Sequence, residues 1–203
     1  MASFTSNRSQ MRLYHPSQGR LYINAAERCR FGEATKQEPS AIGTFCSLLM
    51  FTGCRISEGL ALQTGAIQAE ARLVTFRTLK RRRADSFREV PVPEELITRL
   101  LAQAGSAPSS ERSYLWHHNG QPLNRATAYR WIKRVMGEAN ISDAQACPKG
   151  LRHGYGIHAI RSGVPLNMLQ KWMGHASMST TAIYTNAIGE EEQAIAARMW
   201  TDE

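Results

Sequence analysis

Two runs rich in β-branched and aromatic residues, 72–79 and 87–92, interrupt a chain whose other apolar patterns have helical spacing. Val, Phe and Thr favour strands, and two such runs joined by a short turn predict a β-hairpin. The turn, residues 80–85, is strongly basic. A small antiparallel sheet inserted among helices is an α+β arrangement, so the sequence predicts a mostly helical α+β domain.

Helices are predicted on both sides of this hairpin from apolar spacing and from helix-end residues. Ser40 is a candidate N-cap for an apolar helix that Gly53 ends, and Pro93 opens a helix with acids in its first turn. Asn124 is the predicted cap of a helix that runs to about Ala139. Three shorter helices are predicted over 151–162, 166–173 and 178–185.

Length and hydropathy limit the class of protein. A chain of 203 residues can bury one substantial core but not two large ones. It has no run of about 18 apolar residues that would predict a membrane-spanning helix. Its polar start, Met1 to Gln10, lacks the apolar centre of a signal peptide. We therefore expect a cytoplasmic protein with no membrane partner.

The chain is strongly basic, with 25 Lys and Arg against 17 Asp and Glu and a formal net charge of +8. Such a balance favours a polyanionic partner, either nucleic acid or an anionic membrane surface, although generic basic proteins share it. The sequence has no long basic amphipathic helix, which argues against the membrane surface.

The cysteines and histidines do not predict a metal site. No cysteine belongs to a C-x-x-C pair or has a histidine at ligand spacing. The adjacent pair His117-His118 is interpreted as loop polarity. In a chain without a signal peptide, scattered cysteines indicate reduced, packed thiols. They are Cys29, Cys46, Cys54 and Cys147.

Four side chains are chemically suggestive. Arg55 and His175 each lie close after a glycine that ends a predicted helix, Arg152 lies early in another helix, and Tyr184 lies on a short one. Two guanidinium groups, a histidine and a tyrosine suit phosphoryl transfer to a tyrosine oxygen. Each residue also has an ordinary explanation, such as an ion pair between Arg55 and Glu58 or amphipathic packing of Tyr184.

The segments around these residues resemble a known set of motifs. Residues 52–60, Thr-Gly-Cys-Arg-Ile-Ser-Glu-Gly-Leu, are similar to the first arginine box of the tyrosine recombinases, the phage integrase-like family. Leu151-Arg152-His153 is similar to the second arginine box, and Met173-Gly174-His175 to the Leu-Gly-His turn that follows it. Residues 180–185 resemble the segment of the nucleophilic tyrosine. The resemblance covers about residue 20 to the C-terminus.

The resemblance implies a site-specific DNA recombinase that needs neither a metal nor a cofactor. Tyr184 is expected to attack the scissile phosphodiester, expel the 5′ oxygen and store the bond energy in a 3′-phosphotyrosyl link. Arg55 and Arg152 are expected to grip the non-bridging oxygens, because a guanidinium is planar and stays charged. His175 is expected to add a third hydrogen bond to the same phosphate.

The family takes the leaving-group proton from a lysine of the β-hairpin, which implies Lys80 as the general acid here. Arg81, Arg82 and Arg83 hold their protons too tightly for this step at neutral pH. They are expected to contact DNA phosphates near the cut, although such a basic run also resembles a nuclear localisation signal.

The helix after Asn124 is basic on the side opposite its apolar residues. A basic helix face is often only solvated, but in a chain with a net charge of +8 we expect contact with the DNA backbone. The residues concerned are Arg125, Arg130, Lys133 and Arg134.

One position departs from the family pattern. The family often has a histidine three residues before the second arginine, and this chain has Lys149 there. Lysine can donate to a phosphate oxygen, so Lys149 stays in the expected catalytic set. At neutral pH it does not shuttle a proton as readily as histidine. His153 and Glu58 are expected to be structural support.

The domain organisation and partners are also expectations. We expect residues 1–20 to form an arm and 21–203 a catalytic domain, with no separate N-terminal DNA-clamping domain. This resembles short, catalytic-domain-only members such as fimbrial phase-variation invertases, or a fragment of a longer enzyme. The expected partner is double-stranded DNA, bound by a homotetramer across paired sites that is monomeric when free. Accessory DNA-bending proteins are further expected partners.

The C-terminal segment 190–200 carries an apolar edge of Ile195, Met199 and Trp200 at helical spacing. In the family the segment after the tyrosine often docks on a neighbouring subunit, so this edge is a candidate for docking. Packing within the same chain explains the pattern equally well.

Two other functions stay open. One is a nicking and closing enzyme similar to type IB topoisomerases, which uses the same site. The other is a non-catalytic DNA-binding regulator with the same fold. The full set of Arg55, Lys80, Arg152, His175 and Tyr184 argues against the regulator, whereas Lys149 keeps it open.

Overall fold

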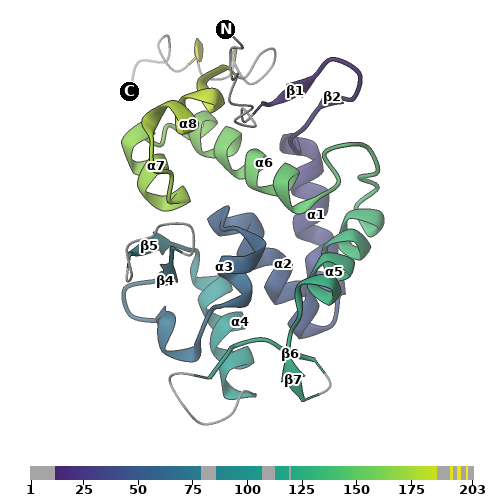
Figure 1. The fold of residues 1–203 in the computed structure, drawn as a ribbon, viewed down its shortest axis with the longest axis vertical. Helices are drawn as coiled ribbons and strands as arrows, with labels where there is room; N and C mark the ends of the chain where they lie inside the picture. Colours follow the sequence, from purple (N-terminus) through teal and green to yellow (C-terminus); the bar gives the residue numbers. More distant parts are fainter. Residues whose placement is uncertain are drawn as a thin grey trace, which may run out of the picture.

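The computed structural model describes residues 12–78, 86–106, 113–118 and 120–186, together with residues 193, 196, 197 and 200. Within these ranges the chain is mainly helical with small antiparallel sheets (Figure 1), which confirms the predicted α+β fold. The helices are α1 (Ala25–Gln37), α2 (Ser40–Thr52), α3 (Ile56–Leu60), α4 (Glu94–Gly105), α5 (Arg125–Glu138), α6 (Pro148–Arg161), α7 (Leu166–Met173) and α8 (Met178–Ala182).

Helix α2 is the centre of the fold, because most of its residues are apolar and buried. It contacts α1, α4, α5 and α6. Gly53 ends it in the left-handed conformation at φ 58°, as predicted. The prediction of Ser40 as its N-cap is wrong. Ser40 is the first helical residue, and Pro39, which has no side-chain donor or acceptor, occupies the cap position.

The central sheet joins β3 (Ile67–Gln68), β4 (Leu73–Arg77) and β5 (Phe87–Pro91) in that order, all antiparallel. This confirms the predicted hairpin, although its turn at 79–85 lies outside the described residues. Val74 pairs with Val90 and Phe76 with Arg88, and these four side chains form the buried side of the hairpin. An arginine on that side is unusual, because a buried charge needs a partner.

Two further pairs of very short strands lie at the margins. They are β1 (Tyr14–His15) with β2 (Gly19–Arg20), and β6 (His117–His118) with β7 (Gln121–Pro122). The two histidines predicted to lie in a loop therefore form an edge strand. Two 3₁₀ turns, Thr64–Ala66 and Ile183–Asn186, complete the described elements.

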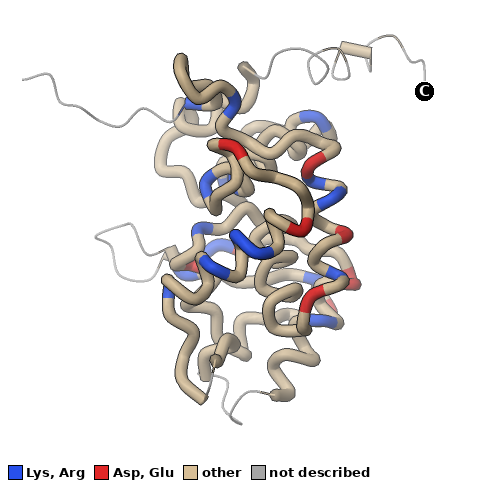
Figure 2. The backbone as a smooth tube through the Cα atoms, turned by 90° about the vertical axis from the view of Figure 1, so that its right-hand side faces the viewer, with Lys and Arg blue, Asp and Glu red and all other residues tan. Residues whose placement is uncertain are grey.

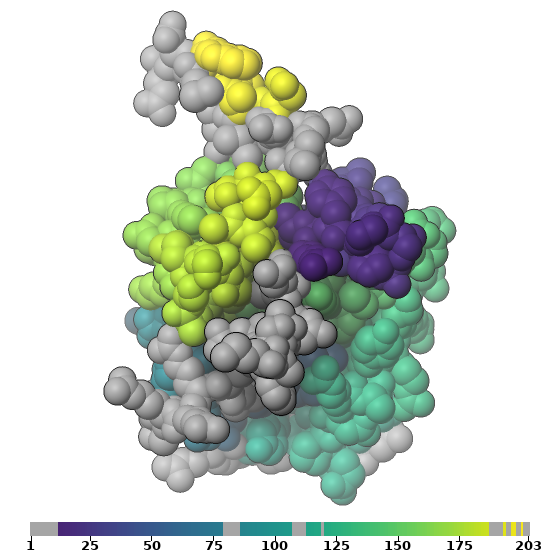
Figure 3. Space-filling model, turned by 45° about the horizontal axis from the view of Figure 1, so that its top comes forward, coloured from purple at the N-terminus to yellow at the C-terminus, as the bar shows by residue number. Residues whose placement is uncertain are grey.

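The N-terminal segment lies at the same end of the molecule as α7 and α8. Figure 3 shows the purple β1–β2 hairpin beside the yellow-green α8 segment. Leu13 and Tyr22 belong to an apolar cluster with Leu169, Met173 and Tyr184. The division into a 1–20 arm and a 21–203 domain stays a prediction, but the described end of the arm packs where Tyr184 lies.

Two helix boundaries near the motifs differ from the predicted ones. Helix α6 begins at Pro148 rather than Leu151, because Cys147 caps it and proline suits the first helical position. The segment predicted as one helix over 178–185 is α8 followed by the 3₁₀ turn Ile183–Asn186. Ser177 caps α8, with its hydroxyl accepting from the Ser179 amide at 3.3 Å.

Candidate active site

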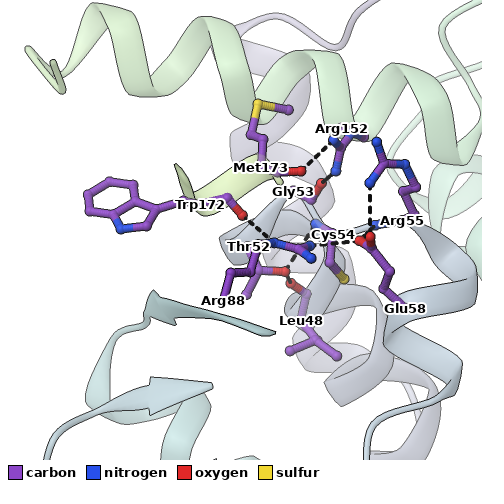
Figure 4. A network of polar contacts seen from close by, with 10 residues as sticks. All are labelled: Leu48, Thr52, Gly53, Cys54, Arg55, Glu58, Arg88, Arg152, Trp172 and Met173. Carbon is purple, nitrogen blue, oxygen red and sulfur yellow. Dashed lines mark hydrogen bonds and ion pairs between the residues drawn. The ribbon is translucent and has the colours of Figure 1, made fainter. Parts of the chain in front are cut away.

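Arg152 joins the ends of two helices. It lies in the first half of α6, is 8% exposed, and donates from Nη1 to the carbonyl of Gly53 and from Nη2 to that of Met173 at 2.7 Å (Figure 4). Both carbonyls lie at the C-terminal end of a helix, where the helix dipole is negative. Burial, and then the charge of Arg55, lower the pKa of Arg152 to about 10, so it is still a cation at neutral pH.

Arg55 lies at the N-cap of α3 and forms a capping box with Glu58. Its backbone amide donates to Glu58 Oε2 at 2.9 Å, and its Nη1 donates to Glu58 Oε1 at 2.9 Å. The Arg55 side chain is 30% exposed, whereas that of Glu58 is fully buried. Glu58 therefore holds Arg55 from the protein side while part of the guanidinium stays accessible to a ligand.

Glu58 also pairs with a second cation, Arg88 of β5, whose Nη2 lies 2.7 Å from Oε2. Arg88 Nε donates to the carbonyl of Trp172 at 2.7 Å, which ties the sheet to the end of α7 (Figure 4). Burial alone raises the pKa of Glu58. The charges and hydrogen bonds of Arg88 and Arg55 offset this and hold its pKa below the usual range, so it is ionised.

Sequence reasoning missed Arg88. The signal was available, since Arg88 alternates with Val90 on the inward side of β5 and an inward arginine in a short strand needs a buried partner. Its Nη1 is buried with no hydrogen-bond partner among the described residues. The guanidinium also lies over the Phe76 ring, 5.1 Å from the centroid.

His175 follows Gly174, the left-handed C-cap of α7 at φ 62°. It is 5% exposed, and its Nδ1 lies 2.9 Å from the Thr181 hydroxyl. Its Nε2 is buried without a partner among the described residues. Burial, then the charges of Arg152 and Arg55, lower the pKa of His175 to about 3, so the ring is neutral at pH 7. A neutral ring with a free nitrogen can still donate one N–H.

Tyr184 lies on the 3₁₀ turn after α8 and is completely buried. Its ring stacks against His175 at a centroid distance of 6.2 Å, and its hydroxyl lies 3.2 Å from His153 Nδ1. It also packs over Gly156, where a Cβ atom would come within 2.6 Å of the ring. Burial raises the pKa of Tyr184 to about 12, although the charges of Arg152 and Arg55 act in the opposite direction.

The structure therefore brings Arg152, His153, His175 and Tyr184 together around the ends of α6 and α7, with Arg55 and Glu58 beside them. Lys149 lies exposed in the first turn of α6, one turn before His153. The predicted acid Lys80 and the predicted DNA contacts Arg81, Arg82 and Arg83 lie outside the described residues.

The base of the hairpin turn lies next to this centre. The amide of Thr78 donates to the carbonyl of Ser86 at 2.7 Å, which closes the hairpin before the undescribed turn. Thr78, Ser86, Arg88 and His175 line one cavity of about 220 Å³.

The basic residues of α5 differ in what they contact. Lys133 donates to the carbonyl of Ala146 at 2.9 Å, and Arg134 pairs with Glu38 at 2.8 Å. Arg130 donates to the Thr127 hydroxyl, and Arg125 is exposed at the start of the helix. Figure 2 shows Lys and Arg distributed over the height of the molecule rather than confined to one element.

Three further expectations concern metal binding, membrane-spanning helices and the apolar edge of the C-terminal segment. Among the described residues no group of three or more His, Cys, Asp or Glu side chains could hold a metal ion. No helix in the described part of the chain is both long and apolar enough to cross a membrane. Of the proposed docking edge, Ile195 and Met199 lie outside the described side chains, and Trp200 is 69% exposed.

Two arginines, two histidines and a tyrosine gathered around helix ends form a set of side chains that could bind a phosphate ester. The sequence profile of the phage integrase family matches residues 22–191. That match spans most of the chain, so the chain belongs to the phage integrase family, which confirms the resemblance found in the motifs.

Known recombinases are similar to this chain in sequence and in fold. A "Tyrosine recombinase" of Thermosipho africanus is 28% identical over 194 residues, covering 86% of this chain and 66% of the relative. The crystal structure of XerA recombinase has a TM-score of 0.75 at 23% identity, covering 90% of this chain and 66% of that one. A XerH recombinase bound to its difH substrate has a TM-score of 0.73 at 20% identity, covering 98% and 58%. The structural likenesses concern the fold, and the chain spans two thirds or less of these proteins.

Proposed function

We propose that this chain is a site-specific DNA recombinase that cleaves and rejoins strands through a 3′-phosphotyrosyl link at Tyr184. The observation that carries the proposal is the position of Tyr184, whose ring stacks on His175 while Arg152 binds the carbonyl two residues before that histidine. In this proposal one phosphate contacts Arg152, His175 and the tyrosine oxygen once the side chains that bury Tyr184 rearrange.

Each proposed role follows from the chemistry of its side chain. Arg55 and Arg152 stabilise the extra charge on the non-bridging oxygens, which is commonly worth about 2.7–4 kcal/mol for each such donor. His175 donates through its free Nε2. Lys80 gives the 5′ oxygen its proton, and Lys149 contributes a further positive charge at the start of α6. No metal or cofactor is part of the proposal.

The proposed partners follow from a relative whose structure contains DNA. A related XerH recombinase was solved with its difH DNA substrate, and the present chain has the same fold. We propose double-stranded DNA as the substrate, a homotetramer on paired sites, and accessory DNA-bending proteins where a site needs them. Residues 21–203 act as the catalytic domain in this proposal, and Arg81–Arg83 with the basic face of α5 contact DNA phosphates.

The test is covalent trapping. The purified chain is incubated with nicked duplexes randomised around the nick, so that a short fragment leaves after cleavage and the adduct persists. The expected result is a denaturation-resistant protein–DNA adduct that Tyr184→Phe abolishes. Tyr155→Phe is the matched control, because Tyr155 is a buried tyrosine of the same apolar cluster with no proposed role. An adduct that survives Tyr184→Phe would disprove the assignment.

A non-catalytic DNA-binding regulator is the second candidate, favoured by Lys149 and by the complete burial of Tyr184. A gel shift on duplexes without any adduct supports the regulator. A nicking and closing enzyme of the type IB topoisomerase kind is separated from a recombinase by its products. It relaxes supercoiled plasmid without joining strands from two differently labelled duplexes, whereas a recombinase makes the mixed joint.

A further inference from the structure

The hydroxyl of Tyr184 is hydrogen-bonded to a residue that the motifs do not place in the catalytic set. Nδ1 of His153 lies 3.2 Å from the tyrosine oxygen, and both residues are completely buried. The ring centroids are 5.8 Å apart at 60°, so the imidazole presents its nitrogen to the hydroxyl rather than stacking on the phenol. The contact is therefore a directed polar contact inside a buried, mainly apolar cluster.

The residue type at 153 suits a role that position 149 cannot fill. A tyrosine that attacks phosphorus must lose its proton to a group with a free lone pair. The ammonium of Lys149 and the guanidinium of Arg152 have none, whereas neutral imidazole has one on a ring nitrogen. His153 lies one helical turn after Lys149 on α6 and faces Tyr184, while Lys149 is exposed.

The protonation states on the two sides of this hydrogen bond are compatible with that role. Burial, then the charges of Lys149 and Arg152, lower the pKa of His153 to about 4, so the ring is neutral at pH 7. The raised pKa of Tyr184 keeps the phenol protonated before attack. A neutral acceptor and a protonated donor are therefore paired.

We propose that His153 accepts the phenolic proton of Tyr184 through Nδ1 as the tyrosine attacks the scissile phosphate. This inference deepens the proposed strand cleavage and rests on it. The Oη–P bond forms and the P–O5′ bond breaks. The phenolic proton moves to Nδ1 and leaves an imidazolium, and the departing 5′ oxygen takes a proton from the proposed acid, Lys80. Rejoining reverses every transfer.

During the reaction, the proton affinity of the Tyr184 oxygen falls and that of His153 Nδ1 rises. A phenolic oxygen that is forming a bond to phosphorus loses its affinity for the proton, since the product is an aryl ester. The phosphodiester anion beside the ring also opposes the positive charges of Lys149 and Arg152, which favours imidazolium. A base that is weak before attack therefore becomes adequate at the transition state.

The first test reads the proton position directly and needs no DNA. Nitrogen-detected NMR of the histidine-labelled chain distinguishes the two neutral tautomers, with His153→Gln assigning the signals. The expected state has the proton on Nε2 and an unprotonated Nδ1 whose shift changes in Tyr184→Phe. A proton on Nδ1 overturns the proposal, because the ring then donates to the tyrosine and cannot accept from it.

The second test separates proton acceptance from support. His153→Gln keeps an oxygen acceptor but cannot take the proton, so adduct formation on duplexes recovered from the trapping pool should slow by roughly 100-fold or more. Fluorotyrosine at position 184 ionises more readily and should restore much of that rate in His153→Gln while changing the wild-type rate little. His158→Gln, on the same helix but outside the cluster, is the matched control with an unchanged rate.

The outcomes distinguish the two levels of the proposal. Wild-type protein that forms no adduct on any duplex of the pool removes the strand-cleavage function and the inference with it. Two results overturn the inference while leaving strand cleavage in place, provided that the wild type forms the adduct. In the first, His153→Gln forms the adduct at the wild-type rate. In the second, His153→Gln is slow and fluorotyrosine at position 184 does not restore its rate. A 5′-thio leaving group should rescue Lys80→Ala but not His153→Gln, and rescue of His153→Gln would also contradict it.

Discussion

Nη2 of Arg88 lies 2.7 Å from Oε2 of Glu58, and both side chains are buried, at 5% and 0% exposure. Because Glu58 also binds Arg55, this pair connects the central sheet to the first arginine motif. Arg88 acts on Arg55 through Glu58, so it is a positioning residue in the proposed site. Removing one partner of a buried ion pair strongly destabilises a protein, because the other charge stays buried without compensation.

Arg88→Met should therefore lower the free energy of unfolding by about 3–5 kcal/mol. The physical reason is that Glu58 keeps its charge in a buried position with only Arg55 to neutralise it. Urea unfolding of the wild type, Arg88→Met, Glu58→Gln and the double variant measures the effect. The double variant should lose less unfolding free energy than the sum of the losses in the two single variants. Strict additivity would show that Arg88 and Glu58 are not coupled.

Arg88 illustrates what the sequence could not supply. The β-branched and aromatic residues of the run 87–92 predict a strand, and the structure confirms it, but this composition does not reveal which side of the strand faces the core. Once Val90 is known to be buried, Arg88 must be buried too. Its partner Glu58 lies 30 residues earlier in the chain, and only the packing of α3 against the sheet brings them together.

The motif residues show a similar limit. The local signals around Gly53 and Gly174 predict helix ends, and both glycines have positive φ there. The roles of Arg55, Arg152, His175 and Tyr184 stay predictions, although the structure brings these residues together. The hydrogen bond between His153 and Tyr184 spans 31 residues and depends on how the 3₁₀ turn lies against α6, which no local pattern encodes.

Gly156→Ala tests the close approach of Tyr184 to α6. The added Cβ would come within 2.6 Å of the ring, which His175 stacks against and therefore cannot yield easily. We expect a loss of roughly 1–3 kcal/mol in unfolding free energy and a slower adduct-forming reaction. Chemical denaturation and covalent trapping measure the two effects.

Gly137→Ala is the matched control, because Gly137 is also helical but its added Cβ meets no atom within 4 Å. Alanine there should raise stability by about 0.5–1 kcal/mol through helix propensity. Equal effects at the two glycines would show that contact with Tyr184 is not what makes position 156 sensitive.

Stability should fall as pH decreases through the range in which unfolded histidines titrate. The pKa values of His153 and His175 in the fold, about 4 and about 3, lie below the ordinary 6.5. Between 6.5 and about 4 the unfolded chain binds more protons than the folded one, so the stabilisation is complete above 6.5 and is lost on acidification. At one pKa unit per 1.36 kcal/mol, the shift of His153 contributes at most about 3 kcal/mol to stability and that of His175 at most about 5 kcal/mol.

Urea unfolding across pH 5–7.5 measures this dependence. His153→Gln and His175→Asn should each flatten the slope below pH 6.5, since each removes one buried group that must stay neutral. A wild-type curve that is level from pH 7 to 5 would mean that these rings are as accessible to protons in the fold as in the unfolded chain.

DNA binding should depend on Arg125 more than on Arg134, although both lie on the basic face of α5. Arg125 is exposed at the start of the helix, whereas Arg134 is held by Glu38 at 2.8 Å. Arg134 must break its ion pair with Glu38 before it can bind a DNA phosphate, so it contributes less net free energy to DNA binding. On a short duplex of random sequence, Arg125→Gln should reduce the slope of log K against log salt by about 0.9. Arg134→Gln should change it by much less, and equal losses would show that the ion pair does not hold Arg134 back.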